Sequence, residues 1–455
     1  MAANSQAVSL NDAANALFNT QRIDDAIELY RQALRLDPRL GVAHYNLGNC
    51  MQAKGLWEAA IEEYEQALQL TPDYAAAHNN LANVLHRLRR HQEATVHYEA
   101  ALRLDPNYPE AWYGLGNVAL YVGQVREAEA CYRECLARKP GFASAHFNLS
   151  LALLLAGDYA AGWPEYEWRW QCADGIGLIT RQFASPPWDG TPAPGATLLV
   201  HAEQGFGDTL QFVRYLRLAR PRVGKLILQC QPELHRLLRT FPEADEVVAE
   251  DAKPPRAGFH APLLSLPHLT GTPLLPATVP YLQADPALAA AWQARLAGPA
   301  LKVGLAWAGR PLNARDYQRS MALSLFAPLL GLRGVRWFAL QKGEAEAQIE
   351  QLPNESAITN LAPQLEDFAD TAAAVSQLDL VVTVDSAVAH LAGALGRPVW
   401  TLLPKVPNWR WGLTGDATPW YSTMRLFRQR TEGDWPGVID DLGRELEELS
   451  AGRGG

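Results

Sequence analysis

A repeat of 34 residues runs through the first third of the chain and constrains its fold more than any other feature. Proline follows this step at Pro38, Pro72, Pro106 and Pro140, and tyrosine follows it at Tyr30, Tyr64, Tyr98, Tyr132 and Tyr166. Leucine repeats at Leu47, Leu81, Leu115 and Leu149, and alanine at Ala26, Ala60, Ala94 and Ala128. Coincident ladders with one period predict a solenoid of equal units, because each unit can bury its apolar face only against its neighbours.

The period and the residue types resemble tetratricopeptide repeats, whose unit is a pair of antiparallel helices. By that resemblance, about five units cover residues 7–172, and the first helix of each pair lines a concave surface. Small alanines let the paired helices approach, tyrosine fills the gap to the next pair, and proline stops the second helix. In the last unit, GDYAAGWPEYEWRW, we expect Trp163, Trp168 and Trp170 to cap the stack and to pack on the next domain.

Asparagine occupies two positions of the repeat that lie one helical turn apart on the same face. The residues are Asn46, Asn80 and Asn148 at one position and Asn49, Asn83 and Asn117 at the other. Because a carboxamide both donates and accepts, such a column can pair with the main chain of an extended peptide whatever its side chains are. The alternative is that these amides only hydrogen-bond between neighbouring repeats. A resemblance to O-GlcNAc transferases, whose repeats hold protein acceptors with an asparagine ladder, favours peptide capture.

From about residue 173 the repeat is replaced by short apolar strands that alternate with amphipathic segments. The expected strands are 197–203, 225–230, 302–309, 335–341, 378–385 and 398–403. Runs that are apolar on both faces and separated by helices are typical of parallel sheets covered on both sides. A Pro- and Ala-rich stretch at 273–300 separates two sets of strands. We therefore predict a helical solenoid over 1–172, followed by two doubly wound α/β domains at 173–285 and 286–455 that enclose a cleft.

The segment HAEQGFGDTLQFVRYL joins a buried strand to an amphipathic helix that begins near Asp208. Gly205 and Gly207 let the backbone approach another molecule, and the first amides of the helix are available as donors. Asp208 either caps the helix, which is worth about 1 kcal/mol, or acts as a general base, which is worth roughly a hundredfold to ten-thousandfold in rate. Glu203 and His201, on the same strand end, are weaker candidates for the base.

The segment LDLVVTVDSAVAHLAGALGRPVWTLL ends a strand at Asp385 and begins a helix at Ser386. A helix N-terminus carries about half a positive charge together with unpaired amides, so it suits a phosphate or diphosphate. Asp385 either anchors sugar hydroxyls or caps the helix. His390, one turn further along, is either a core residue or a contact to the donor.

Both motifs resemble those of inverting glycosyltransferases with the GT-B fold, which is a pair of Rossmann-like domains. The GFGD loop resembles the Gly-Asp loop of heptosyltransferases, and VDSAVAHLAGALGRP resembles their D-(T/S)-x-x-x-H-L-x-A-x-L-x-x-P donor motif. With the repeats and the segment WYSTMRLFRQ, the chain is similar from end to end to bacterial tetratricopeptide-repeat glycosyltransferases. The resemblance implies that Asp208 is the catalytic base. It implies nucleotide-sugar contacts from Gly205, Gly207, Asp385, Ser386, Ala387 and His390.

Further contacts to the donor are expected between these motifs. The lysine that this family carries after the fifth strand is not obvious, but GRPLNARDYQRSMAL offers Arg315 and Arg319. A guanidinium fork suits a diphosphate leaving group. The strand end FALQKGEAE places Gln341 and Lys342 within reach of the nucleotide. The segment PNWRWG, with Arg410 between two tryptophans, is either a wall of the site or plain domain packing.

Composition limits the partners and the compartment. The formal net charge is -9, from 40 Lys and Arg against 49 Asp and Glu, which gives no long-range attraction for nucleic acid. The five cysteines show no CxxC pairing, so neither a disulfide nor a zinc site is expected. No segment approaches the roughly 20 apolar residues that cross a bilayer, and no secretory leader is evident. We therefore expect a cytoplasmic protein without a membrane span.

The expected function is inverting transfer of a sugar from a nucleotide-sugar to a protein acceptor held by the solenoid. The resemblance suggests Ser or Thr of a bacterial protein such as a flagellin. No metal or other cofactor is expected, because amides and a guanidinium carry the charge of the leaving group and no Asp-x-Asp lies at a credible strand end. Two alternatives stay open: transfer to a lipid-linked or polysaccharide acceptor, and a noncatalytic scaffold with a degenerate transferase region. The sequence identifies neither the sugar nor the oligomeric state.

Overall fold

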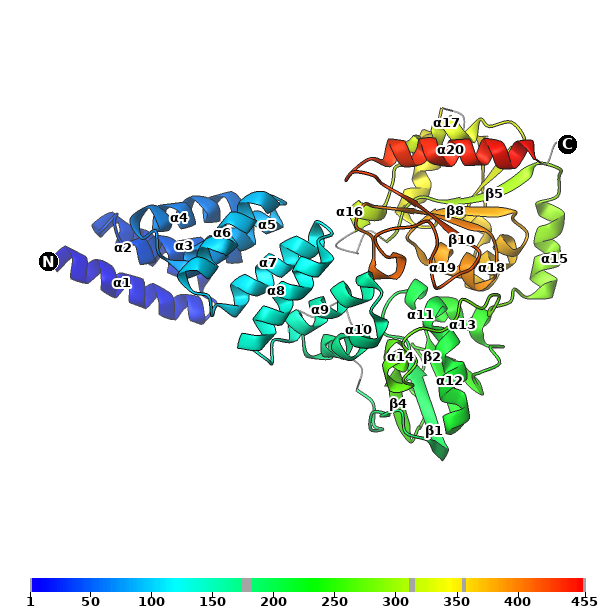
Figure 1. Ribbon diagram of the computed structural model, residues 1–455, viewed down its shortest axis with the longest axis horizontal. Coiled ribbons are helices and arrows are strands. Elements are labelled where there is room, and N and C mark those ends of the chain that lie inside the picture. Colours follow the sequence, from blue (N-terminus) through cyan, green and yellow to red (C-terminus); the bar gives the residue numbers. More distant parts are fainter. Residues whose placement is uncertain (1, 173–181, 311–315, 354–356, 453–455) are drawn as a thin grey trace. The chain divides into compact units, whose positions relative to one another are not determined.

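The computed structural model describes residues 2–172, 182–310, 316–353 and 357–452 (Figure 1). The chain divides into two compact units, Met1–Leu153 and Leu154–Gly455. The first unit is helical, and the second contains both sheets. This order of elements confirms the predicted fold class, a helical solenoid followed by an α/β region.

Paired helices build the first unit. They are α1 (Ala2–Asn19), α2 (Ile23–Leu36), α3 (Gly41–Ala53), α4 (Trp57–Leu70), α5 (Ala75–Arg87), α6 (His91–Leu104), α7 (Pro109–Tyr121), α8 (Val125–Arg138) and α9 (Ala143–Ala156), whose C-terminal end belongs to the second unit. The helices α2, α4, α6 and α8 each end two residues before a proline of the ladder. Proline therefore ends the second helix of each pair, as the period predicts.

The ladder tyrosines are buried because glycines make room for their rings. A Cβ atom added at Gly48 would lie 2.6 Å from the ring of Tyr64 on the other helix of the same pair. A Cβ atom at Gly114 would lie 2.3 Å from the ring of Tyr98, which belongs to the preceding pair. Real Cβ atoms do not approach this closely, so any larger residue at these positions would push the helices apart.

The second unit begins with α10 (Tyr159–Tyr166) and one short 3₁₀ helix, η1 (Glu167–Gln171). Trp163 on α10 is 1% exposed, and its indole nitrogen donates to the carbonyl oxygen of Pro273 at 2.7 Å. Its ring stands edge-on to Phe212 and Trp409, with centroids 5.6 and 5.4 Å away. Trp163 thus packs on the α/β region, as predicted.

The first sheet has the strand order β3-β2-β1-β4, and all its neighbours are parallel. Its strands are β1 (Ala193–His201), β2 (Val223–Cys230), β3 (Glu246–Ala249) and β4 (Phe259–Pro262). The helices between them are α11 (Phe206–Phe212), α12 (Leu216–Ala219) and α13 (Pro232–Leu238), and α14 (Leu266–Leu269) follows. The strand order reverses between β1 and β4, so the loop that leaves β1 lies at the switch point where such sheets bind ligands.

The second sheet has the order β10-β9-β8-β5-β6-β7, again parallel throughout. Its strands are β5 (Leu301–Ala306), β6 (Val335–Ala339), β7 (Ile358–Asn360), β8 (Leu380–Val384), β9 (Val399–Leu403) and β10 (Met424–Arg428). Numbered from β5, this is the 3-2-1-4-5-6 order of dinucleotide-binding domains. The switch point lies between β5 and β8, where the sheet core is made of fully buried Val and Leu.

Helices cover both faces of the second sheet. These helices are α15 (Pro286–Arg295), α16 (Asp316–Arg319), α17 (Ala327–Leu330), α18 (Phe368–Ser376), α19 (Ala387–Ala394) and α20 (Trp435–Ala451). Figure 1 shows α17 and α20 on one side of β5 and β8, and α18 and α19 on the other. From this second side, α19 packs on α11 and α18 packs on α13. The two sheets therefore meet through the helices that follow β1, β2, β7 and β8.

Candidate active site

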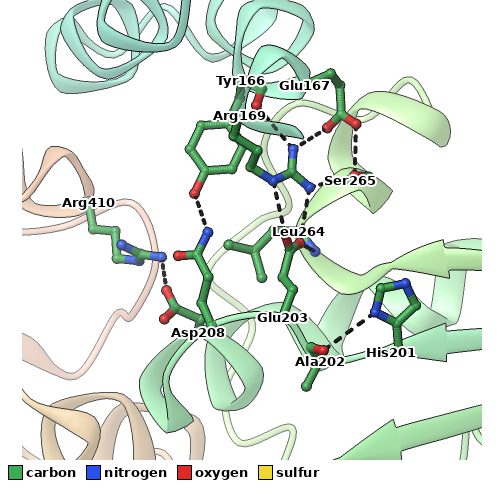
Figure 2. A network of polar contacts seen from close by, with 11 residues as sticks. Tyr166, Glu167, Arg169, His201, Ala202, Glu203, Asp208, Leu264, Ser265 and Arg410 are labelled. Atoms are coloured by element: carbon green, nitrogen blue, oxygen red, sulfur yellow. Dashed lines mark hydrogen bonds and ion pairs between the residues drawn. The ribbon is translucent and has the colours of Figure 1, made fainter. Parts of the chain in front are cut away.

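The loop after β1 positions Asp208 at the start of α11. Gly205 is the N-cap of this helix, and its amide donates to the Oδ2 atom of Asp208 at 2.9 Å. The Oδ1 atom of Asp208 accepts a hydrogen bond from Nη2 of Arg410 (Figure 2). The carboxylate therefore caps the helix and pairs with a cation at once. Its side chain keeps 18% of its surface exposed.

Arg410 comes from the other half of the second unit and joins it to α11. It lies in the short helix η9 (Trp409–Trp411), and its Nε donates to the side-chain oxygen of Gln211 on α11. Its Nη1 donates to Asn408 at 2.9 Å, and the guanidinium lies 4.3 Å from the centroid of the Trp409 ring. The sequence placed PNWRWG near the site but gave Arg410 no partner, because the contact joins residues that are 202 positions apart.

The turn between β8 and α19 carries Asp385 and Ser386. Ser386 is the N-cap of α19, and its hydroxyl lies 2.9 Å from that of Thr383 without capping the helix. Arg319 donates through Nη1 to the carbonyl oxygen of Asp385 at 2.9 Å. Burial raises the pKa of Asp385, while the charges of Arg319 and Arg410 oppose that shift. The charges of two guanidinium groups thus act on one carboxyl group at the start of α19.

The structure brings most of the predicted site residues together. The negative charge of Asp208 contributes to the raised pKa of Asp385, and Arg410 pairs with Asp208. Ala387 is the first residue of α19, beside Ser386. Arg319 is held in place by Asp316, whose Oδ1 accepts from Nε at 3.0 Å. The predicted candidate Arg315 lies outside the described residues.

Gly207 and His390 hold the two helices together, which differs from the donor contacts predicted for them. A Cβ atom at Gly207 would lie 2.6 Å from Cδ2 of His390 and 3.6 Å from the Cα of Ala387, so α11 approaches α19 through this glycine. His390 is 4% exposed; its Nδ1 lies 2.9 Å from the hydroxyl of Tyr421, and its ring stacks on Trp411. Burial lowers the pKa of His390, and the nearby arginines lower it further. His390 is therefore a neutral core residue.

Replacing Gly207 with alanine is expected to destabilise the second unit by about 1–3 kcal/mol, because the new methyl group overlaps the His390 ring. Gly195→Ala is the matched control, since a Cβ atom there meets nothing within 4 Å, and we expect a change below about 0.5 kcal/mol. Urea unfolding of both variants measures the difference. Equal midpoints would mean that α11 and α19 are not packed through Gly207.

Gln341 and Lys342, for which the sequence predicts contacts to a nucleotide, both make hydrogen bonds within the chain. The Oε1 atom of Gln341 accepts from the amides of Trp307 and Ala308 at 3.0 and 2.9 Å, and its Nε2 donates to Lys342 O. The side chain is 5% exposed, so it braces the end of β5 against the end of β6. The ammonium group of Lys342 donates to the carbonyl oxygens of Ala362 and Leu365.

Glu203 is part of a buried ion pair and is not available as a base. Its two carboxylate oxygens accept from Nε and Nη2 of Arg169 at 2.9 and 3.0 Å, and both side chains are fully buried (Figure 2). One of these oxygens also accepts the amide of Leu264 at 3.0 Å. Arg169 also donates to Glu167 and Ser265, so η1 is tied to the end of β1. Burial raises the pKa of Glu203, against the opposing charge of Arg169.

His201, the other weak candidate, is buried as well. It is 4% exposed, and its ring stacks on Phe183 with centroids 4.4 Å apart. Phe183 also stacks on His260, so the end of β1 and the start of β4 share one aromatic cluster. Of the three candidates for the base, Asp208 at the start of α11 is the one whose side chain is partly exposed.

The asparagine ladder of the first unit hydrogen-bonds between neighbouring repeats. At one position the amide oxygen accepts the hydroxyl of a ladder tyrosine, as in Tyr64 to Asn49 at 2.7 Å, Tyr98 to Asn83 at 2.6 Å and Tyr132 to Asn117 at 2.9 Å. At the other position the side chain donates back to the preceding repeat, as in Asn46 to Asn15, Asn80 to Asn49 and Asn148 to Asn117. These bonds correspond to the structural alternative. Asn15, 34 residues before Asn49, is a further member of the ladder that the period alone would have predicted.

The described residues set limits on other kinds of site. No three His, Cys, Asp or Glu side chains within them gather in a way that could hold a metal ion. No helix in this part of the chain is long and apolar enough to cross a membrane. Cys50, Cys131, Cys135 and Cys230 are buried free thiols.

Comparisons with known proteins match both halves of the chain. Family models of tetratricopeptide repeats match residues 14–55, 52–88 and 73–141. The model of glycosyltransferase family 9 (heptosyltransferase) matches residues 326–431. These matches bear out the two resemblances on which the sequence analysis relied.

One curated relative is Protein FlbA of Caulobacter vibrioides, which is 30% identical over 329 residues. The match covers 66% of this chain and 54% of FlbA, so the chain spans about half the length of this relative. The crystal structure of MamA is 25% identical, with a TM-score of 0.32, and covers 34% of this chain and 91% of MamA. That of PilW, a type IV pilus biogenesis factor, is 25% identical, with a TM-score of 0.34, and covers 38% of this chain and 86% of PilW.

These findings agree with the order of elements in the structure. The repeat matches fall within α1 to α9, and the family 9 match begins before β6 and ends after β10, so it includes β8 and the Asp385–Ser386 turn. The chain thus joins segments that match tetratricopeptide repeats to a segment that matches the model of glycosyltransferase family 9.

Proposed function

We propose that the protein is an inverting glycosyltransferase that moves a sugar from a nucleotide-sugar to a protein acceptor without a metal ion. The observation that carries this proposal is the contact of Asp208, at the end of one parallel sheet, with Arg410, which lies beside Asp385 at the end of the other. The family 9 match at 326–431 supports the same reaction class. Two facing sheet ends provide separate places for a donor and an acceptor.

In this proposal the diphosphate of the donor binds at the N-terminus of α19. The first amides of the helix donate to phosphate oxygens, and the helix dipole favours their negative charge. Arg319 and Arg410 supply the additional charge that the leaving group needs. Asp385 accepts hydrogen bonds from hydroxyl groups of the sugar or ribose.

The chemical step is a single displacement at the anomeric carbon. Asp208 takes the proton of the acceptor hydroxyl, the acceptor oxygen forms its bond to the anomeric carbon, and the bond from that carbon to the diphosphate oxygen breaks. The leaving electron pair stays on the nucleoside diphosphate. Because attack and departure occur on opposite faces, the anomeric configuration inverts.

The acceptor in this proposal is a hydroxyl side chain of a polypeptide held by the solenoid. Transfer to a lipid-linked or polysaccharide acceptor is the competing version. Mass spectrometry of reactions that contain the protein, a donor and both kinds of acceptor separates them. Sugar found only on the glycan acceptor would contradict the proposed acceptor class and leave the donor site intact.

A screen of nucleotide-sugars by thermal unfolding tests the donor site. A donor at a hundredfold excess over its Kd should raise the free energy of unfolding by about 2.7 kcal/mol. In Arg319→Ala we expect the Kd for the donor to rise at least tenfold, because a charge-assisted hydrogen bond contributes about 1.5–3 kcal/mol to binding. Arg336→Ala is the control, since Arg336 is exposed near the start of β6, at the amino ends of the strands and not at the carboxyl ends where the donor is proposed to bind. Failure of every nucleotide-sugar, nucleotide-activated heptoses included, would contradict the proposed donor site.

A further inference from the structure

A pocket of about 410 Å³ lies within the first unit, between α1, α3, α4 and α5. Its wall includes Phe18 and Trp57 as large aromatic side chains, together with the ladder amides and one cation. The polar members used below are Asn49, Asn80, Asn83 and Arg87. A volume of this size accommodates one or two side chains of a peptide rather than a single water.

The ladder leaves two hydrogen-bond donor groups for the pocket. The oxygen of Asn49 already accepts from Tyr64 and from Asn80, and the oxygen of Asn83 accepts from Tyr98. The Nδ2 groups of Asn49 and Asn83 have no partner within the described part of the chain. Since the bonds between repeats use the amide oxygens, the nitrogens that remain can only donate. These two free amide groups match a ligand that brings acceptor oxygens.

The cation at the wall of the pocket also has no counterion. The guanidinium of Arg87 lies 4.4 Å from the centroid of the Trp57 ring and is exposed. No carboxylate of the described residues pairs with it. Arg138 makes a similar stack on Trp112, at 5.3 Å, but its guanidinium also pairs with Glu134. The stack at Trp57 thus holds a cation in place and leaves its donors for a partner.

The ladder is interrupted at the repeat that follows the pocket. Gly114 occupies the position that is asparagine at Asn46, Asn80 and Asn148. The oxygen of Asn49 accepts a hydrogen bond from the amide of Asn80, and the oxygen of Asn117 accepts one from the amide of Asn148. Within the described residues the oxygen of Asn83 accepts no such bond, because Gly114 has no side chain. The amide with the most unused capacity therefore lines the same pocket as the unpaired arginine.

We propose that this pocket binds the carboxylate of an Asp or Glu side chain in an extended polypeptide. Arg87 pairs with the carboxylate, the amides of Asn49 and Asn83 donate to its oxygens or to the neighbouring main chain, and Trp57 and Phe18 contact the apolar stem. The inference rests on the proposed role of the solenoid as the acceptor-binding part. Its test needs no sugar donor, so failure of transfer and failure of peptide binding are separate results.

A peptide array tests this preference with the full chain. Each of the twenty amino acids is fixed in turn at the centre of otherwise degenerate peptides, and bound protein is measured at low and high salt. We expect Asp and Glu to be enriched about tenfold or more over Asn and Gln at low salt, because charge-assisted bonds contribute about 1.5–3 kcal/mol.

Three variants give this experiment its controls. Arg87→Gln should remove the preference for acidic residues, and Arg87→Glu should reverse it in favour of Lys and Arg. Arg138→Gln should leave the preference unchanged, because the guanidinium that stacks on Trp112 already pairs with Glu134. Circular dichroism confirms that each variant is folded. The proposal is overturned if the wild-type chain shows no acidic preference, if it binds no peptide, or if Arg87→Glu retains the original preference.

Discussion

Replacement of Asp208 by asparagine is expected to lower the rate constant of glycosyl transfer by roughly a hundredfold to ten-thousandfold, with little change in the affinity for the donor. Asparagine keeps the shape of the side chain and can still accept the amide of Gly205, but it cannot take a proton from the acceptor. The measurement is a single-turnover rate with the donor identified by the unfolding screen, together with the KM for that donor.

The control for this variant is another aspartate that caps a helix. Asp285 accepts hydrogen bonds from the amides of Ala287 and Leu288 at 2.9 and 3.1 Å at the start of α15. Within the described residues it forms no hydrogen bond or ion pair with Arg319 or Arg410. Asp285→Asn should retain the wild-type rate. If Asp208→Asn also retains it, Asp208 serves only as a cap and as a partner of Arg410, and the assigned base is wrong.

Replacement of Glu203 by alanine is expected to lower the free energy of unfolding of the second unit by about 3–5 kcal/mol. The change removes the carboxylate from a pair that is 0% exposed on both sides and leaves the guanidinium of Arg169 buried with less charge to oppose it. Glu167 and Ser265 remain as partners of Arg169, which places the expected loss inside this range rather than above it. Denaturant unfolding followed by tryptophan fluorescence measures the loss.

An exposed ion pair in the same sheet provides the comparison. Lys225 and Glu246 lie 2.6 Å apart, with side chains 46% and 42% exposed, so Glu246→Ala should cost no more than about 1 kcal/mol. The double variant Arg169→Met with Glu203→Leu should lose less stability than Glu203→Ala, because it leaves no unpaired charge. Similar losses for Glu203→Ala and Glu246→Ala would contradict a structural role for the buried pair.

The central strands of both sheets could be predicted from the sequence, and the edge strands could not. The expected runs at 197–203, 225–230, 302–309, 335–341, 378–385 and 398–403 correspond to β1, β2, β5, β6, β8 and β9. The strands that were missed are β3, β4, β7 and β10, and each is an edge strand. An edge strand is short and faces solvent on one side, as in β3, where Glu246 is exposed, so it lacks the continuous apolar run of a central strand.

For the candidate site too, the sequence predicts some residues and misses the contacts between distant segments. Residues next to a glycine turn or a helix start, such as Asp208, Asp385 and Ser386, could be found because local chemistry marks them. The pairing of Asp208 with Arg410 and the burial of Glu203 by Arg169 could not, since these contacts depend on how distant segments pack. For the same reason Gln341 and His390 were predicted as ligand contacts although they are buried within the chain.

The bonds between repeats also bear on how this kind of chain changes its length. Each complete junction is assembled from an asparagine, a tyrosine 15 positions later and an asparagine 31 positions later, so it closes within a single period. The junction at Asn83 lacks the second asparagine, because Gly114 occupies its position. Removal or duplication of one whole block of 34 residues would present the same donors to the same acceptors. A shorter insertion would break the register at two junctions. Recombination in whole blocks is therefore the route by which such a gene can lengthen or shorten its array without losing a fold.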